Sequence, residues 1–153
     1  MARTGMIVEW LGVLVDDDGD ALPGVPAAVS RLAMRQVPVV AIDPRANGGG
    51  SLAQVIGPLR PLRDHHERFI LPRPGLILRA AQEHDLDLPT SWVIARGDAF
   101  AHAAAQAGCA GCVLIGTAPP DEDLGIVVAQ ARDFADAPRV MIPRDGGCWH
   151  APW

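Results

Sequence analysis

An acidic residue closes the first apolar run of the chain, where an α/β protein would keep reacting groups. Residues 6–15 (MIVEWLGVLV) predict a buried strand that runs into a turn, and Glu9 is the one ionisable residue among them. Ligands of open α/β sheets bind at the carboxyl ends of the strands. A carboxylate there can serve as a nucleophile or a proton carrier. Trp10 and Leu11 follow Glu9, and neither can serve as a nucleophile or a proton carrier. Most of the chemistry expected at this position is therefore missing.

A second acidic group comes just after this run. Residues 16–20 (DDDGD) have the composition of an acidic turn, and Leu22-Pro23-Gly24 then predicts the start of a helix. Asp16 and Asp18 are an alternative pair of catalytic carboxylates. If these carboxylates were catalytic, only Ala21 would separate the acidic group from the helix start. Because this leaves little chain between the two, we favour the acidic turn.

Cysteine and histidine raise the question of a zinc site. Cys109-x-x-Cys112 and Cys148-x-His150 have zinc-like composition. The first pair flanks the amino end of one predicted strand and the second follows the carboxyl end of another. The two pairs should therefore lie at opposite edges of the sheet, and we expect reduced thiols and no bound metal. The pair His65-His66 is expected to face solvent.

The elements that would position these groups alternate along the chain. Short apolar runs between helical patterns predict βαβ units, hence an α/β fold with a parallel sheet of about five strands in one domain over residues 1–153. The segment 57–69 is expected to be irregular. The predicted strands are 6–15, 37–42, 91–95, 112–116 and 139–142, and the predicted helices are 25–35, 51–56, 74–84, 98–107 and 121–135.

Composition excludes several classes of partner. The net charge is −5, and nucleic-acid binding needs a basic face. All thirteen cationic residues are arginine, so no mechanism can use a lysine ammonium. No run of about 18 apolar residues predicts a membrane span, and the first residues lack the pattern of a signal peptide. We expect a cytoplasmic protein that binds neither nucleic acid nor membrane.

Two segments together resemble the haloacid dehalogenase (HAD) superfamily of phosphatases. The likeness is strongest to its histidinol-phosphatase and heptose-bisphosphate phosphatase branch. Residues 9–13 (EWLGV) fall on the D-x-D-G-T motif of this branch, residues 16–20 on its acidic turn and residues 22–26 (LPGVP) on its L-P-G-V helix start. Residues 72–81 (PRPGLILRAA) resemble its K-P-x-P-G helix, and Ser91-Trp92 and Ala107-Gly108-Cys109 continue the match.

The resemblance implies a capless three-layer Rossmannoid fold and a magnesium-dependent phosphatase site. Members use one Asp as nucleophile, a second Asp as acid and base, a hydroxyl and a Lys on the phosphoryl group, and further acids on Mg²⁺. In this sequence the corresponding positions hold other residues, while the turn glycine is kept as Gly12. The degenerate positions are Glu9, Leu11, Ile42, Leu71, Arg96 and Phe100.

A pseudophosphatase is the function that we expect from this pattern: a binding, regulatory or scaffolding module without turnover, metal or cofactor. Arg96 replaces a metal-binding carboxylate, so we predict that its guanidinium pairs with the Glu9 carboxylate. A small anion is one expected ligand. The candidate ligand-binding residues are Glu9, Gly12, Asp43, Arg73, Arg96 and Asp98.

Two alternatives remain open at this point. The first is an active magnesium-dependent phosphatase, which would use Asp16 with Asp18, or Glu9 with Asp98 through a small bulge. The second is a homodimer, or a complex with another protein, held through the sheet edge and the tail 146–153, which carries two of the four tryptophans.

Overall fold

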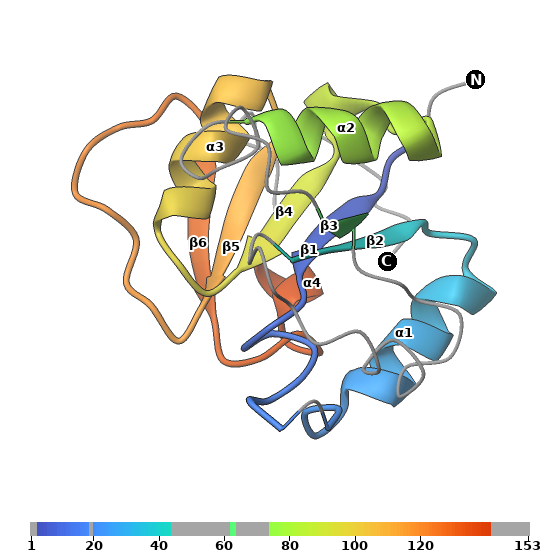
Figure 1. Ribbon diagram of the computed structural model, residues 1–153. Helices are drawn as coiled ribbons and strands as arrows, with labels where there is room; N and C mark the ends of the chain where they lie inside the picture. The colour runs from blue at the N-terminus through green and yellow to red at the C-terminus, as the bar shows by residue number, and fades with distance from the viewer. Residues whose placement is uncertain (1–2, 19, 44–61, 64–73, 142–153) are drawn as a thin grey trace.

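A parallel sheet forms the centre of the molecule in the computed structural model, which describes residues 3–18, 20–43, 62–63 and 74–141 (Figure 1). Its strand order is β3-β2-β1-β4-β5-β6, and every neighbouring pair is parallel. The strands are β1 (Met6–Glu9), β2 (Val39–Asp43), β3 (Leu62–Arg63), β4 (Trp92–Ala95), β5 (Gly111–Ile115) and β6 (Val127–Ala131). The helices are α1 (Val25–Met34), α2 (Gly75–His84), the 3-10 helix η3 (Leu88–Thr90), α3 (Ala99–Ala107) and α4 (Ala137–Val140).

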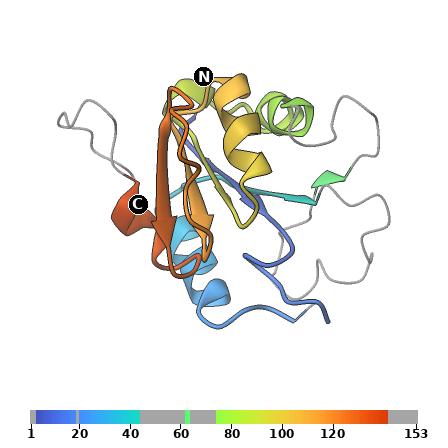
Figure 2. The same cartoon turned by 90° about the vertical axis from the view of Figure 1, so that its left-hand side faces the viewer.

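Helices cover both faces of the sheet, which gives the expected three layers. The edge-on view in Figure 2 shows α2 and α3 on one side and α1 and α4 on the other. Alternate residues of each strand point to opposite layers: Met6 and Val8 pack toward α1 and α4, whereas Ile7 packs toward α2 and α3. The central strands are therefore buried on both faces, as parallel strands are. The predicted α/β fold class is confirmed.

Several element boundaries follow local chemistry. Helix α1 begins after Gly24, whose φ of 82° suits glycine, and Pro26 stands in its first turn, where a missing N–H costs little. Helix α3 ends at Ala107, and the capping residue Gly108 that follows it is also left-handed with φ 82°. Strand β1 ends at Glu9, sooner than predicted, because the chain turns directly after it.

Two predictions for the last third of the chain were wrong. Residues 121–135, expected to be one helix, contain β6, which completes the edge of the sheet beside β5. Residues 139–142, expected to be a strand, overlap the short helix α4. The segment 57–69, expected to be irregular, contributes the two-residue strand β3, so the sheet has six strands. The predicted helix 51–56 and the tail 146–153 lie outside the described residues.

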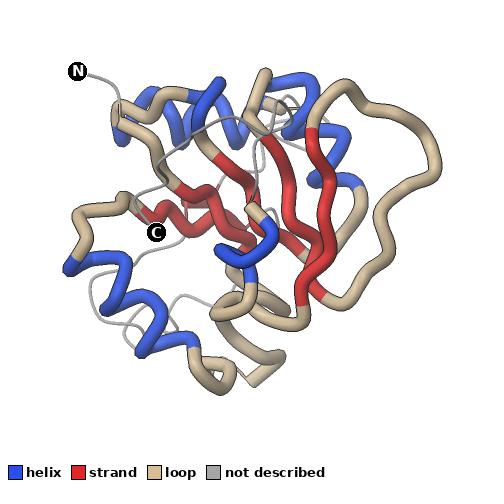
Figure 3. The backbone as a smooth tube through the Cα atoms, turned by 180° about the vertical axis from the view of Figure 1, so that it is seen from behind, coloured by secondary structure: helices blue, strands red, loops and turns tan. Residues whose placement is uncertain are grey.

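The tube view in Figure 3 shows the strands running side by side, with loops joining them at both ends. Within the described ranges, every helix falls short of the length and apolar character that crossing a bilayer requires.

Candidate functional site at the carboxyl edge of the sheet

The turn after β1 brings the chain from the sheet into a hairpin. The carbonyl of Trp10 accepts hydrogen bonds from the N–H groups of Leu14 (3.1 Å) and Val15 (3.0 Å), which makes one helix-like turn. Gly12 lies in this turn with φ 86°, and its N–H donates to the carbonyl of Val15 at 2.8 Å. A side chain at that φ would be strained, so the turn accounts for this glycine.

The acidic group lies on the hairpin that follows the turn. Val15 and Ala21 form an antiparallel bridge. The side-chain oxygen Oδ1 of Asp16 accepts the N–H groups of Asp18 (3.0 Å) and Asp20 (2.9 Å), as Asp does in tight turns. The strand therefore ends at Glu9, while Asp16 and Asp18 lie beyond the turn on the hairpin.

Glu9 and Arg96 are neighbours, but the contact between them differs from the predicted ion pair. Oε1 of Glu9 accepts the backbone N–H of Arg96 at 2.7 Å. Among the ion pairs between described residues, none joins the two side chains. The loop after β4 passes close enough to Glu9 for the backbone amide of Arg96 to donate to the carboxylate directly. The carbonyl of Arg96 in turn accepts Oγ1–H of Thr117 at 2.6 Å, so this loop is held from two sides.

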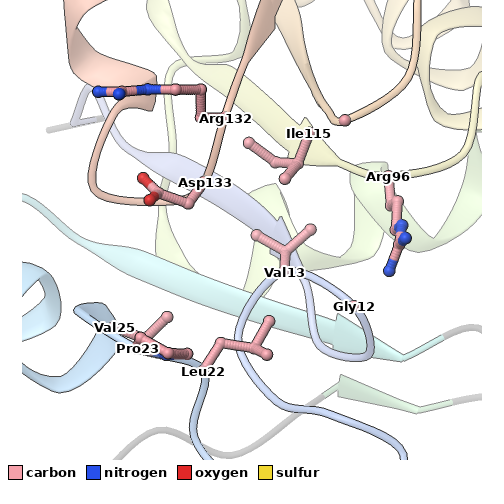
Figure 4. Close-up of a pocket in the computed structure, with 10 residues that line it drawn as sticks. Gly12, Val13, Leu22, Pro23, Val25, Arg96, Ile115, Arg132 and Asp133 are labelled. Atoms are coloured by element: carbon pink, nitrogen blue, oxygen red, sulfur yellow. The ribbon is translucent and has the colours of Figure 1, made fainter.

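The Arg96 side chain lies over the turn at Gly12. A Cβ atom placed on Gly12 would stand 3.1 Å from Cδ of Arg96 and 3.6 Å from its NH1 nitrogen. Glycine is thus needed here both for its φ and for the room that the arginine takes. Figure 4 shows Arg96 extending along one side of a pocket beside Gly12.

Apolar side chains occupy several positions that the resemblance assigns to catalysis. Ile42 and Phe100 are buried, at 0% and 1% exposure. Leu11 is partly buried and pairs with Val15 in a bridge. Leu71 and Arg73, like His65-His66, lie outside the described residues. None of the three described side chains can transfer a proton or hold an anion.

The two remaining candidates lie at the same edge of the sheet. Asp43 is the last residue of β2, in register with the end of β3. Asp98 is exposed and precedes α3, and its side chain makes no capping hydrogen bond to the helix.

A magnesium ion would need several oxygen ligands close together. In the parts of the chain that the structure describes, no three His, Cys, Asp or Glu residues gather closely enough for a metal. The guanidinium-bearing Arg96, at a metal-ligand position of the resemblance, adds positive charge. The described residues therefore offer no ready-made cage of protein ligands for a metal ion.

The two described cysteines are buried thiols. Burial raises the pKa of Cys109 to about 12, and burial together with the neighbouring Cys109 raises that of Cys112 still further. Both thiols therefore stay protonated at neutral pH, which makes them poor nucleophiles. Cys148 and His150 lie outside the described residues.

A pocket of about 310 Å³ opens beside the turn, on the α1 side of the sheet (Figure 4). It lies where β1, β4, β5 and β6 end, and the start of α1 closes it. Of the residues that line it, only Gly12 and Arg96 are among the ligand-binding candidates predicted from the sequence. The residues that line it are Gly12, Val13, Leu22, Pro23, Val25, Arg96, Ile115, Gly116, Arg132 and Asp133.

The loop after β6, which supplies Arg132 and Asp133 to the pocket, is fixed by Asp136. The carboxylate of Asp136 accepts Nε of Arg139 at 2.8 Å, a second nitrogen of the same guanidinium at 3.1 Å, and the N–H of Arg132 at 3.1 Å. These bonds hold the pKa of Asp136 well below its usual range, with the Arg139 hydrogen bonds as the largest cause. Asp133 accepts the N–H of Asp136 at 2.8 Å.

Solved structures with the same arrangement define the class of fold. The chain is similar to D,D-heptose 1,7-bisphosphate phosphatase from B. bronchiseptica, whose structure contains magnesium and phosphate (24% identity, TM-score 0.65, covering 90% of this chain and 97% of that one). It is similar to an L-2-haloacid dehalogenase (10%, TM-score 0.70, 92% and 99%) and to a hydrolase from Pseudomonas syringae (13%, TM-score 0.66, 90% and 96%).

These likenesses show that the chain has the HAD-like fold, as the resemblance predicted. At this level of identity they show the fold alone. Comparison of the sequence with models of protein families finds no match, and neither does comparison with curated proteins.

Proposed function

We propose that this protein is a pseudophosphatase: a HAD-like domain that binds a ligand or partner in a regulatory or scaffolding role and does not turn over phosphate esters. The observation that carries this proposal concerns the residues at the end of β1 and just after it. There, the Glu9 carboxylate receives the Arg96 backbone N–H at 2.7 Å, and Leu11 stands two residues further on.

Electrostatics supports the proposal. A carboxylate can attack a phosphate dianion only if cations cancel the repulsion between them. The described residues at this edge offer no metal-binding cluster. Leucine cannot protonate a leaving group, and general acid catalysis contributes about 10²- to 10⁴-fold to a rate.

The length of Glu9 adds a geometric argument. A glutamate extends one methylene further from the backbone than the aspartate of the resembling motif. A displacement of a reacting atom by about 1 Å can lower a rate about 100-fold. The misplaced nucleophile, the missing general acid and the missing cation would all slow the same step, the attack on phosphorus. We therefore expect no measurable turnover.

The test is a phosphatase assay of the full chain on p-nitrophenyl phosphate, with and without Mg²⁺. We expect wild type, Glu9→Gln and Asp16→Asn to give the same rate as buffer. Asp98→Asn serves as a third variant, because Asp98 is an exposed carboxylate in the loop next to Glu9.

Each possible activity would leave its own signature. Magnesium-dependent turnover lost in Glu9→Gln and Asp98→Asn would establish an active phosphatase built on those two carboxylates. Turnover lost only in Asp16→Asn would assign the chemistry to the hairpin. Either result would overturn the proposal.

A further inference from the structure

The pocket beside Gly12 combines an apolar floor with charge at its sides. Val13, Val25 and Ile115 are nearly fully buried, and Figure 4 shows Val13, Leu22 and Ile115 approaching one another around the same space. A volume of about 310 Å³ is at the low end for small-molecule sites. An occupant must therefore be small and must carry a compact hydrocarbon part.

Arg96 supplies a cation that the rest of the described chain leaves available. Its backbone is bonded to Glu9 and Thr117, whereas its guanidinium takes part in none of the hydrogen bonds or ion pairs between described residues. A guanidinium presents parallel N–H groups that match the two oxygens of a carboxylate. The anionic group of a ligand would therefore lie on the Arg96 side.

The other side of the pocket limits how much negative charge the ligand can carry. Asp133 and Arg132 lie there, so the lining has two arginines and one aspartate. The aspartate is fixed in place by its bond to the N–H of Asp136. The Arg132 guanidinium is paired with Asp136 at 3.6 Å, so Arg96 is the lining arginine that no described carboxylate pairs, and one available cation favours a monoanion over a phosphate dianion.

We propose that this pocket binds a small monocarboxylate with an apolar body, held by Arg96 at its carboxylate and by Val13, Leu22 and Ile115 along its hydrocarbon part. The inference rests on the proposed function in one respect, that a module without turnover acts through what it binds. The proposed ligand differs from the phosphate ester that the resemblance would suggest.

The experiment is a titration of the full chain with hexanoate, followed by ¹H–¹⁵N correlation spectra, alongside hexanamide and inorganic phosphate. We expect saturable shifts at Gly12, Arg96 and Gly116 with hexanoate. The neutral amide should bind at least 10-fold more weakly, because it lacks the charge that pairs with arginine. Phosphate should give no saturable shift at these residues.

Variants separate the pocket from general surface charge. Arg96→Gln should weaken hexanoate about 10- to 100-fold, as expected for a lost charge-assisted contact. Leu22→Trp, at the partly exposed rim, should fill the space and remove binding. Arg31→Gln makes the same charge change on α1, outside this pocket, and should leave the affinity unchanged.

Three results would overturn the inference: phosphate binding more tightly than hexanoate, equal binding of hexanoate and hexanamide, or affinity unchanged in both Arg96→Gln and Leu22→Trp. The comparison of the three ligands needs no variant, so a folding defect leaves it intact. Turnover of p-nitrophenyl phosphate would refute the proposed function without touching the titration, so the two failures are distinguishable.

Discussion

Replacing Gly12 by alanine tests the geometry of the turn and its contact with Arg96 together. At φ 86° an alanine pays about 1–2 kcal/mol for the left-handed conformation. Restricting the unfolded chain offsets about 0.4–1 kcal/mol of this cost. The expected net loss of unfolding free energy is about 1 kcal/mol, which lowers the melting midpoint by about 2–4 °C in a chain of this size.

The new methyl group would also press on the arginine. It would stand 3.1 Å from Cδ of Arg96, so the side chain must shift by a few tenths of an ångström. If the guanidinium holds the ligand carboxylate, hexanoate should bind about 5-fold more weakly, which corresponds to about 1 kcal/mol.

Gly108→Ala is the matched control for this prediction. Gly108 has nearly the same φ, 82°, and nothing lies within 4 Å of the position of its Cβ. Urea denaturation should give both variants the same loss of stability, whereas only Gly12→Ala should lose affinity for hexanoate. Equal affinities in the two variants, or wild-type stability in Gly12→Ala, would refute the reasoning.

Three further predictions concern the scaffold. Gly111→Ala should cost about 1–3 kcal/mol or more in urea denaturation, because its Cβ would stand 2.7 Å from Cη2 of the buried Trp92; wild-type stability would contradict the β4–β5 packing. Asp136→Asn should cost about 1–2 kcal/mol at pH 7. The folded pKa of Asp136 lies below the unfolded value near 4, so its contribution to the free energy of unfolding is present above about pH 4 and is lost as the pH falls further. The difference in unfolding free energy between variant and wild type should therefore shrink below about pH 4. A difference that stayed constant from pH 7 to pH 2 would argue against the Arg139 bonds. Cys112, fully buried with a raised pKa, should resist alkylation at pH 8 until denaturant is added, as read by peptide mass spectrometry; rapid labelling of the native protein would contradict its burial.

The first part of the fold was predictable because its local signals agree with one another. Val25-Pro26 after Gly24 marks a helix start by turn chemistry as well as by apolar spacing. The apolar run before Glu9 has no competing pattern, so the first strand was predicted in the right place, although it ends at Glu9 and not at residue 15.

The last part of the fold was not predictable from local signals. Residues 127–131 (VVAQA) follow a predicted acidic helix start and contain helix-forming Ala and Gln, yet they form a strand because the open side of β5 offers a full parallel ladder. Val140-Met141 looks like part of a strand, but Asp136 and Pro138 open the short helix α4, which includes Val140.

These errors also explain what was missed at the site. With residues 121–135 predicted to be a helix, nothing placed Arg132 and Asp133 at the carboxyl edge; once β6 is known to end at Ala131, the strand-end rule points to them. The proximity of Glu9 and Arg96 could be predicted from the motif positions. Which atoms of Arg96 meet the carboxylate depends on the path of the loop, and sequence does not give that path.

The burial of Ile42 and Phe100 has an evolutionary consequence. The apolar interior includes Ile42 and Phe100, two positions to which the resemblance assigns polar groups. A polar group introduced at either position would be taken out of water without a ready partner, which commonly costs about 1–3 kcal/mol. On the proposed function, each single polar substitution at these two positions would therefore weaken the fold before it could add any reactivity, which makes a return to catalysis by successive mutations difficult.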